Sequence, residues 1–458
     1  MKKLPTIGIS TLGCPKNLVD TENIVGILHA AGYPITADHA KADISLVNTC
    51  TFIEASTNES KEVLDDLSSK GKKLIIAGCM AQRQKEKLFN QYPNAQAVVG
   101  TGNIKDILGV VKEVTANLNS KGDLRIVKVD HLPDAVATSE TPRLNTQIGP
   151  SAYLKIAEGC DHRCAFCIIP YLRGDMKSRT IEDIVTEAKM LVKSGVREVV
   201  LVSQDSTAYG TDIYKKRALA DLLKEVADKS GSKWIRLMYA YPTELSEEML
   251  DVIKEKNNIV QYIDIPLQHA RAKILKSMKR PDTVRDTVEL IRKKIPNCTI
   301  RTTFIVGFPG ETEKDFDELY GFIEESRFDR VGVFTYSKEK DTPAFDFKEQ
   351  VPEEIKQKRR EKLMLLQQKI SLEKNKEFIG KDLEMLVEHI EHHKSNVVKI
   401  VGRSFRDAPE IDGQLYINIE PTGLRDYEPM KKRPEPGEFI KVKVLDCDEY
   451  DLFCELIN

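Results

Sequence analysis

Three cysteines in one short run constrain this chain more than any other feature of its sequence. Cys160, Cys164 and Cys167 stand at CxxxCxxC spacing in the run EGCDHRCAFC, directly after a strand-like segment at 153–157. A four-iron cluster takes four ligands when it is fully coordinated. A compact triple of thiolates therefore predicts a cluster that leaves one iron open to another ligand. Such an iron is reactive, not merely a carrier of electrons.

Two other uses of these thiols must be considered. Structural zinc usually has four Cys or His ligands, and His162, inside the triple, could be the fourth. Disulfide bonds fit less well, because nine cysteines in 458 residues are an odd and sparse count and no signal peptide precedes them. The iron–sulfur interpretation is favoured, and zinc stays open as the alternative.

The length of the chain indicates several domains. At 458 residues it exceeds what one hydrophobic core normally serves, and we expect three domains. No apolar run approaches the roughly 18 residues that a membrane span needs. The first residues, MKKLPTIGIS, lack the apolar region of a targeting peptide and are expected to begin a strand. We therefore expect a cytoplasmic protein without a membrane segment.

The charge is balanced overall but uneven along the chain. There are 69 Lys and Arg against 71 Asp and Glu, so the whole chain lacks the basic character of a nucleic-acid binder. Residues 377–458 contain 18 acidic and 11 basic residues, a local net charge of −7. This segment should attract a basic protein and repel an RNA backbone, and the effect should weaken with salt. No direct nucleic-acid binding is expected.

The first part of the chain reads as a parallel α/β domain. Apolar strands are expected at 7–11, 44–48, 74–78 and 97–100, with helical segments between them. Residues 117–148 are rich in Pro, Ser, Thr, Asn and Gly and predict a linker with one strand near 126–129. The first domain is therefore placed at 1–116.

A second series of strands and helices predicts a partial (β/α)6 barrel at 149–376. The strands are expected at 153–157, 198–203, 235–239, 262–266, 301–306 and 331–336. One intervening helix should begin at Thr180, with Asp183 at its third position, and stop at Gly195. Catalytic groups of such a sheet belong at the carboxyl ends of its strands.

The end of the chain predicts a charged helix followed by a small β domain. Residues 353–378 have helical periodicity, with Ile355, Leu363, Leu366 and Ile370 on one stripe. From Leu383 onward, short alternating runs separated by Gly, Pro and Asp predict an all-β barrel over 377–458.

A second group of cysteines lies in the first domain, each directly after an apolar strand. ISTLGC ends at Cys14, SLVNTC at Cys50 and IIAGC at Cys79. Parallel strands bring their carboxyl ends to one edge of a sheet, so these three thiols can meet there. Any one alone could be a small buried hydrophobe. Their repetition, with Gly or Thr before each Cys, predicts a second metal site.

Weaker signals surround the first triple. Phe166 could pack in the core or lie against a cofactor, and Gln204 and Asp205 follow a barrel strand, where polar groups could hold a ligand. Gly307, in IVGFPGE, permits close backbone approach but also suits a plain turn. Gln268 and His269 follow another strand, and a core histidine is as good an interpretation as a catalytic one.

The other cysteines and histidines are expected to be structural. A solvated turn is the preferred interpretation of the triplet His389, His392 and His393, because no Cys lies near it in the sequence. Cys298, Cys447 and Cys454 follow no comparable pattern and are expected to pack.

The motifs together resemble a known family, the radical S-adenosylmethionine (SAM) methylthiotransferases. The resemblance covers the whole chain and rests on GCPKNLVDTE, NTC followed by FIEASTNES, AGCMAQR, LKIAEGCDHRCAFCIIPYLRG, QDSTAYG, PLQHARAKILKSMKR, RTTFIVGFPGET and GRSFRDAPEIDG. The last motif is most similar to the branch that modifies an aspartate of ribosomal protein uS12, and the branch that modifies tRNA adenosine is the alternative. Two departures, Thr51 in place of an expected glycine and Phe453 or Cys454 where a glycine is common, touch no expected ligand.

The resemblance implies two 4Fe-4S clusters and SAM. Cys160, Cys164 and Cys167 would hold the cluster that cleaves SAM, and Cys14, Cys50 and Cys79 the auxiliary cluster that presents sulfur. The target carbon of an aspartate is saturated and lies beside a carboxylate, which discourages deprotonation, so a radical route is required. A second SAM would donate the methyl group.

The resemblance also implies partners. A C-terminal TRAM domain would engage uS12 or the small ribosomal subunit, and an electron donor such as flavodoxin or ferredoxin would reduce the enzyme, which is expected to be a monomer. From other classes, an iron–sulfur electron carrier and a zinc-containing ribosome-assembly factor remain as alternatives.

Overall fold

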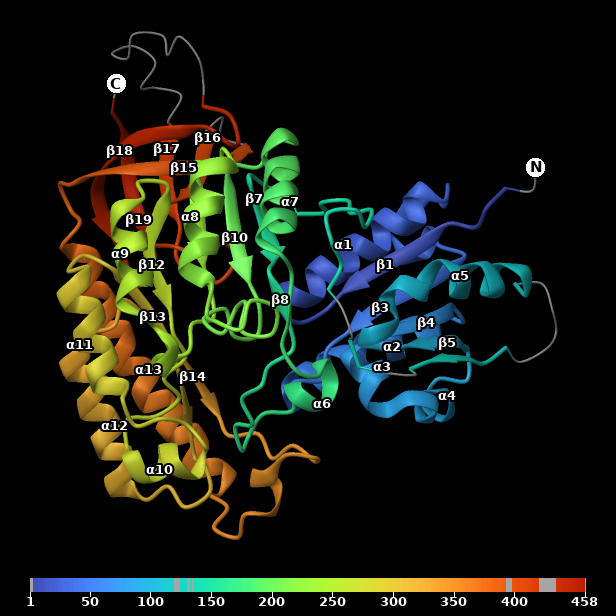
Figure 1. The fold of residues 1–458 in the computed structure, drawn as a ribbon, viewed down its shortest axis with the longest axis horizontal. Coiled ribbons are helices and arrows are strands. Elements are labelled where there is room, and N and C mark those ends of the chain that lie inside the picture. Colours follow the sequence, from blue (N-terminus) through green and yellow to red (C-terminus); the bar gives the residue numbers. More distant parts are fainter. Residues whose placement is uncertain are drawn as a thin grey trace.

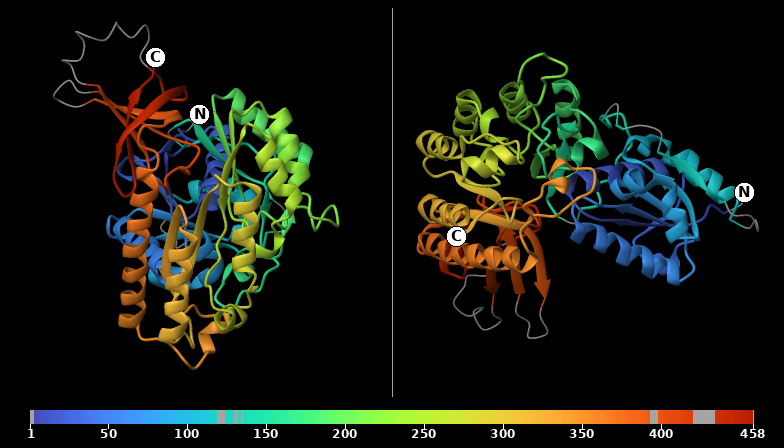
Figure 2. Two further views of the ribbon diagram at one scale, coloured as in Figure 1. Left: turned by 90° about the vertical axis from the view of Figure 1, so that its left-hand side faces the viewer. Right: turned by 90° about the horizontal axis from the view of Figure 1, so that it is seen from below.

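The protein folds into three units that lie against one another (Figure 1). The computed structural model describes residues 3–118, 124–129, 132–133, 136–147, 149–392, 398–419 and 434–457. An N-terminal α/β lobe lies beside a larger α/β unit, and a small C-terminal barrel lies across one end of the larger unit (Figures 1 and 2).

The N-terminal lobe is built on a parallel sheet in the order β2-β1-β3-β4-β5-β6. Its strands are β1 (Ile7–Thr11), β2 (Ile35–Thr36), β3 (Ile44–Thr49), β4 (Lys73–Gly78), β5 (Ala95–Val99) and β6 (Ile126–Lys128). Its helices are α1 (Pro15–Ala30), α2 (Glu54–Ser69), α3 (Cys79–Gln84), α4 (Leu88–Gln91) and α5 (Ile107–Ala116), with short 3-10 turns η1 (His39–Lys41), η2 (Lys85–Lys87) and η3 (Thr101–Asp106). The predicted parallel α/β fold is confirmed.

Both faces of this sheet are buried, which explains why its strands read as continuous apolar runs. Leu46 and Ile75 lie in one core with α1 and α5, whereas Val47 and Ile76 lie in a second core on the opposite face. β6 comes from the segment expected to be a linker, yet it pairs with β5 and completes the sheet.

The second unit contains a six-stranded parallel sheet in the order β14-β13-β12-β11-β10-β7. Its strands are β7 (Ser151–Lys155), β10 (Glu198–Val202), β11 (Trp234–Leu237), β12 (Ile259–Asp264), β13 (Thr299–Val306) and β14 (Arg330–Thr335), and β8 (Ala157–Glu158) pairs separately with β9 (Lys177–Ser178). The helices are α6 (Ile169–Arg173), α7 (Ile181–Lys193), α8 (Leu219–Lys229), α9 (Glu247–Glu255), α10 (Ala272–Ser277), α11 (Val284–Lys294) and α12 (Glu313–Ser326), with η4 (Pro242–Glu244) and η5 (Pro343–Asp346). All six predicted strands are present.

The start of α7 follows its sequence signals. The hydroxyl of Thr180 accepts a hydrogen bond from the backbone N–H of Asp183, and Gly195 follows the helix at a φ of 107°. The amphipathic stripe of α7 packs into the main core through Ile184, Ala188 and Leu191.

The C-terminal part begins with α13 (Glu353–Lys376) and continues as a closed barrel. The barrel order is β15-β16-β17-β19-β18, from β15 (Asp382–His392), β16 (Val398–Arg403), β17 (Leu415–Ile419), β18 (Phe439–Cys447) and β19 (Leu452–Leu456). Leu363, Leu366 and Ile370 of α13 pack against the main core as expected. Ile355 differs from the expectation because it is largely exposed near the start of the helix.

A loop of the C-terminal barrel fills the inner face of the six-stranded sheet. Residues 404–412, between β16 and β17, belong to the GRSFRDAPEIDG motif, and Phe405 and Ala408 pack in one core with Tyr153 and Trp234 of the sheet. The backbone carbonyl of Phe405 accepts a hydrogen bond from Arg236 at 2.9 Å. This open sheet therefore obtains its interior packing from another unit of the chain.

Candidate metal centre

The structure brings Cys14, Cys50 and Cys79 together at one edge of the N-terminal sheet. Strand register aligns Thr11 with Asn48 and Thr49 with Gly78, so β1, β3 and β4 end side by side. Cys50 and Cys79 come directly after β3 and β4, and Cys14 comes three residues after the last residue of β1. The three thiols lie close enough for Cys14 and Cys50 to affect the pKa of Cys79, which burial raises to about 11.

The small residues before these cysteines have a physical explanation. Gly13 and Gly78 adopt φ values of 87° and 88°, which residues with a Cβ rarely adopt. A Cβ on Gly13 would also lie 2.7 Å from the sulfur of Cys50. The Thr49 hydroxyl instead donates a hydrogen bond to the carbonyl of Ala77 at 2.5 Å, which ties β3 to β4. The small residue before each cysteine is therefore explained by a tight turn at the end of each of the three strands.

Cys160, Cys164 and Cys167 lie on the loop between β8 and α6. The N–H of Cys160 donates to Gly174 at 3.0 Å, and the N–H of Cys167 donates to the carbonyl of Cys164 at 3.1 Å. Burial raises the pKa of Cys160 and of Cys167 to about 12, so these thiols must lose protons when they bind a metal.

His162, the possible fourth ligand of a zinc site, has other partners in the structure. Within the described residues, no group of three or more His, Cys, Asp or Glu side chains is arranged to hold a single metal ion. Nε2 of His162 donates a hydrogen bond to the carboxylate of Asp205 at 2.8 Å, and the His162 ring stacks on Tyr241 with ring centroids 3.6 Å apart. Ligands of a cubane bind different irons and stand further apart than ligands of one ion. The donor set, three thiols in each group, fits two such clusters.

A buried arginine connects the two groups of cysteines. Arg173 ends α6, shortly after Cys167, and its Nη2 lies 3.5 Å from the sulfur of Cys79. Its Nη1 donates to Asp20 at 2.7 Å and to Glu158 at 2.9 Å. Ile168 and Leu172 also pack against Cys79. Both groups of cysteines therefore face the same interface between the lobe and the sheet.

A second arginine lies beside the other group. Arg280 stacks on Tyr241 with its guanidinium 4.0 Å from the ring centroid. Burial raises the pKa of the Cys164 thiol, and the neighbouring Arg280 offsets part of that rise. Neither Arg173 nor Arg280 can be identified from the sequence, because nothing in their spacing relates them to the cysteines.

The four weaker candidates lie near the cysteine loop, and most have partners within the protein. Gln204 donates to Glu158, and its Oε1 is a buried acceptor without a hydrogen-bond partner in the described structure. Asp205 bonds to His162 and accepts from Thr207. Phe166 packs beside Ala165, Phe308 and Tyr336. Gly307 has a φ of 72°, and a Cβ there would collide with the side chain of Lys356.

The histidines and remaining cysteines have structural surroundings. His269 is fully buried, and its Nδ1 accepts from the N–H of Arg271 at 2.9 Å. His389 and His392 lie on β15 and not in a turn, and His393 lies outside the described residues. Cys298 packs in the main core, Cys454 in the core of the C-terminal barrel, and Cys447 against that barrel core.

One further residue beside the auxiliary cysteines escaped the sequence analysis. Lys16, in the first turn of α1, is only 8% exposed. Its Nζ lies 3.4 Å from the centroid of the Tyr239 ring, just beyond the carboxyl end of β11. Burial alone would lower the pKa of Lys16, but Tyr239 and Cys14 raise it overall.

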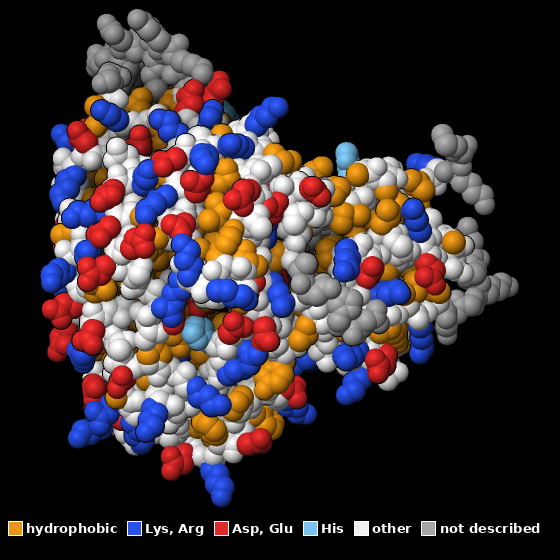
Figure 3. All heavy atoms as spheres, viewed as in Figure 1, with side chains coloured by type: hydrophobic (Ala, Val, Ile, Leu, Met, Phe, Trp, Pro, Cys, Tyr) orange, Lys and Arg blue, Asp and Glu red, His pale blue; other side chains and the backbone are white. Residues whose placement is uncertain are grey.

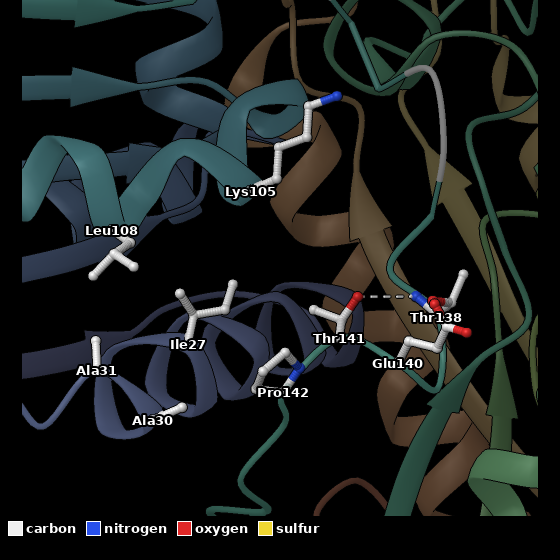
Figure 4. A pocket seen from close by; sticks show the side chains of 9 residues that line it. All are labelled: Ile27, Ala30, Ala31, Lys105, Leu108, Thr138, Glu140, Thr141 and Pro142. Carbon is white, nitrogen blue, oxygen red and sulfur yellow. Dashed lines mark hydrogen bonds between the residues drawn. The ribbon is translucent and has the colours of Figure 1, made fainter.

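A pocket elsewhere on the N-terminal lobe contains none of the predicted ligands. It has a volume of about 520 Å³ and lies between Ile27 of α1, Leu108 of α5 and the segment 138–142 (Figure 4). Thr138 and Thr141 close one side through a hydrogen bond of 3.3 Å.

Three family matches follow the three units. Residues 6–100 match the uncharacterized protein family UPF0004, residues 154–323 the radical SAM superfamily and residues 379–457 the TRAM domain. The "Ribosomal protein uS12 methylthiotransferase RimO" of Trichormus variabilis is 45% identical over 461 residues, covering 100% of both chains. The chain belongs to the RimO methylthiotransferase family. The RimO protein of Crocosphaera subtropica is likewise 45% identical over 460 residues, with 100% of both chains covered.

A solved structure shares much of this fold. The radical SAM methyltransferase TsrM of Kitasatospora setae, solved with cobalamin and a [4Fe-4S] cluster, superposes with a TM-score of 0.54 at 14% identity. The match covers 75% of this chain and 77% of TsrM.

No helix in the described part of the chain has the length and apolarity to cross a membrane. The face shown in Figure 3 mixes acidic and basic side chains.

Proposed function

We propose that this enzyme transfers a methylthio group to an aspartate side chain of ribosomal protein uS12 by radical SAM chemistry. Full-length similarity to proteins named uS12 methylthiotransferase is the observation that carries the proposal. Two groups of three cysteines at one interface provide the donor set that two 4Fe-4S clusters require.

Each of the two clusters is bound by three of the six cysteines. Cys160, Cys164 and Cys167 hold the cluster that binds SAM, and the thiols at 14, 50 and 79 hold the auxiliary cluster. When bound, these groups supply electron transfer, hydrogen abstraction and the sulfur and methyl that are inserted. The protein orients them and excludes other hydrogen donors.

The side chains around the cysteines position the cofactors. The buried Arg173 and the partly buried Arg280 place a positive charge beside each group, and a cluster of thiolates and iron carries negative charge. The unpartnered Oε1 of Gln204 is available to the ammonium of SAM. Three further residues complete the SAM site. Asp205 fixes His162 through a hydrogen bond, and Phe166 lies against the adenine. Gly307 permits the backbone turn beside the cofactor.

The finer assignments follow from this activity. The domains span 1–116, 149–376 and 377–458, with a linker at 117–148 that also supplies β6 to the sheet of the first domain. The enzyme works as a monomer in the cytoplasm, where uS12 is found free or in the small ribosomal subunit. Flavodoxin or ferredoxin supplies the electrons. The acidic C-terminal segment favours a basic ribosomal protein over RNA.

A competition assay tests the substrate. Anaerobically reconstituted enzyme is incubated with SAM, a reductant, purified uS12 and bulk tRNA, and both products are analysed by mass spectrometry. We expect one methylthio group on an aspartate of uS12 and none on tRNA, and no transfer by Cys164→Ala. Transfer to tRNA alone would refute the proposed substrate.

The same reaction tests the enzyme class. A fully ligated electron carrier would release no 5′-deoxyadenosine from SAM, whereas the proposed enzyme should release it in a reaction that requires Cys160, Cys164 and Cys167. Absence of this product from protein that contains its full iron would contradict radical SAM chemistry.

A further inference from the structure

Lys16 differs from the other buried cations at the interface between the lobe and the sheet. Lys155 pairs with Asp20 and Glu158, and Arg173 pairs with the same two carboxylates. In the described part of the chain, no carboxylate oxygen lies within ion-pairing distance of Lys16, although its side chain is over nine-tenths buried. A buried charge is costly unless an anion faces it, and beside Lys16 that anion is either the auxiliary group or a bound ligand.

Lys16 lies between the auxiliary group of cysteines and the inner face of the six-stranded sheet. It follows Cys14 by two residues, so it lies beside the auxiliary group. The next turn of α1 enters the inner core of the sheet through Leu18 and Val19, which pack with Met238 and Tyr239. Lys16 therefore lies at the carboxyl ends of the strands, where catalytic and binding groups of such sheets gather.

The backbone opposite Lys16 is strained. Tyr239 adopts a φ of 64°, which is unfavourable for a residue with a large side chain. Its N–H donates to Asp264 at 3.1 Å, and Asp264 accepts from Arg301 at 2.8 Å. Strain of this kind persists mainly at ligand-binding sites. The strained turn places the aromatic ring against Lys16, while Asp264 is already engaged by Arg301.

The first turn of α1 adds to the positive potential. The helix has 16 residues and begins with Cys14 as its N-cap, without a side-chain cap, and with Pro15 in the first turn. Free backbone N–H groups and the helix dipole favour an anion at this end. The N-terminus of α1 and the ammonium of Lys16 therefore both attract an anion to the same place.

We propose that Lys16 binds the side-chain carboxylate of the substrate aspartate and so selects aspartate at the modified position. The inference rests on the proposed function. The carbon to be modified is bonded to that carboxylate, so an ion pair with Lys16 sets the carbon between the auxiliary group and the mouth of the sheet. The ring of Tyr239 covers the ammonium and keeps it from turning away.

Equilibrium binding tests this role without turnover. Reconstituted enzyme without SAM is titrated with uS12 and with uS12 in which the modified aspartate, mapped by the assay above, is replaced by asparagine. Lys16→Met and Lys16→Gln are compared with the wild type. Lys87→Met, which removes an exposed lysine of the same lobe, is the matched control.

The wild type and the control should bind the aspartate form about 10- to 100-fold more tightly than the asparagine form, the range for a hydrogen bond to a charged group. Both Lys16 variants should bind the two forms equally. A preference that survives in the variants would overturn the inference, as would equal binding by a wild type that methylthiolates uS12.

Two measurements separate other failures. Iron content should equal that of the wild type in at least one Lys16 variant. Loss of iron from both would overturn the inference, because Lys16 would then serve the cluster site. A wild type that never modifies uS12 would instead refute the proposed function, and the inference with it.

Discussion

An arginine beside each group of cysteines, buried at Arg173 and partly buried at Arg280, is the main electrostatic feature at the scale of single residues. Arg173 contacts Cys79 and is 2% exposed, and Arg280 lies beside Cys164. A buried guanidinium is tolerated only when it is well paired, and Arg173 has Asp20 and Glu158 as partners. Arg173 therefore holds the lobe to the sheet and provides a cation for the auxiliary site.

Replacing Arg173 should strongly destabilise the folded protein. Arg173→Met leaves two buried carboxylates with only Lys155 to compensate them, and should lower the free energy of unfolding by about 3 to 5 kcal/mol. The control Arg163→Met removes an exposed pair with Asp175 and should cost less than about 1 kcal/mol. Urea unfolding of the cluster-free chain measures both. Equal losses would show that the Arg173 network has no special weight.

The cysteines could be predicted from the sequence, whereas their charged neighbours could not. Cys50 and Cys79 each follow a buried strand, and strand order alone brings such positions together. Arg173 and Lys16 have no local signal, because Asp20 is 153 residues from Arg173 in the sequence and Tyr239 belongs to a different unit from Lys16, so each pair comes close only when two units pack. Tyr239 could not be identified from the sequence for the same reason.

At the scale of elements, the loop at 404–412 joins the C-terminal barrel to the sheet. Arg403, at the end of β16, donates to Glu198 of β10 at 2.6 Å, and Arg236 of β11 donates to the same carboxylate at 2.7 Å. Tyr262 donates to Asp412 at 2.6 Å. In the sequence, GRSFRDAPEIDG served only as a family marker, because a polar loop gives no indication that it will be buried.

This network should make stability depend on acid. Burial alone would raise the pKa of Glu198, but Arg403 and Arg236 lower it to about 2, below its usual 4.5. Between these values the unfolded chain binds more protons, so about 3 kcal/mol of stability, present above pH 4.5, is lost as the pH falls through 2. Urea unfolding from pH 7 to 3 should show a smaller decline in Glu198→Gln. An identical decline would contradict the assigned pKa.

At the scale of the molecule, the six-stranded sheet depends on its neighbours for a complete interior. Val19 of the N-terminal lobe and Ala408 of the C-terminal barrel pack in one core with Val200 and Tyr262 of the sheet. Composition and strand alternation predicted three units, and the parallel sheets and the barrel are confirmed. Their mutual packing could not be predicted, because periodicity reports which face is apolar and not what covers it.

Removing the C-terminal barrel should therefore expose an apolar surface. A chain of residues 1–376 would uncover Tyr153, Trp234 and Tyr262, and it should aggregate or bind the dye ANS, which reports exposed apolar surface. Size-exclusion chromatography and dye fluorescence are the measurements. A compact, dye-free truncated chain would show that the C-terminal barrel is an independent attachment.

Iron and sulfide quantification tests the central claim, that six cysteines form two separate cluster sites, most directly. Anaerobically reconstituted wild type should contain about eight irons per chain. Changing Cys14, Cys50 and Cys79 to alanine, or Cys160, Cys164 and Cys167 to alanine, should remove about half of the iron and sulfide in each case. If either triple change leaves the iron content unchanged, or abolishes it entirely in a folded chain, the account of two independent sites is wrong.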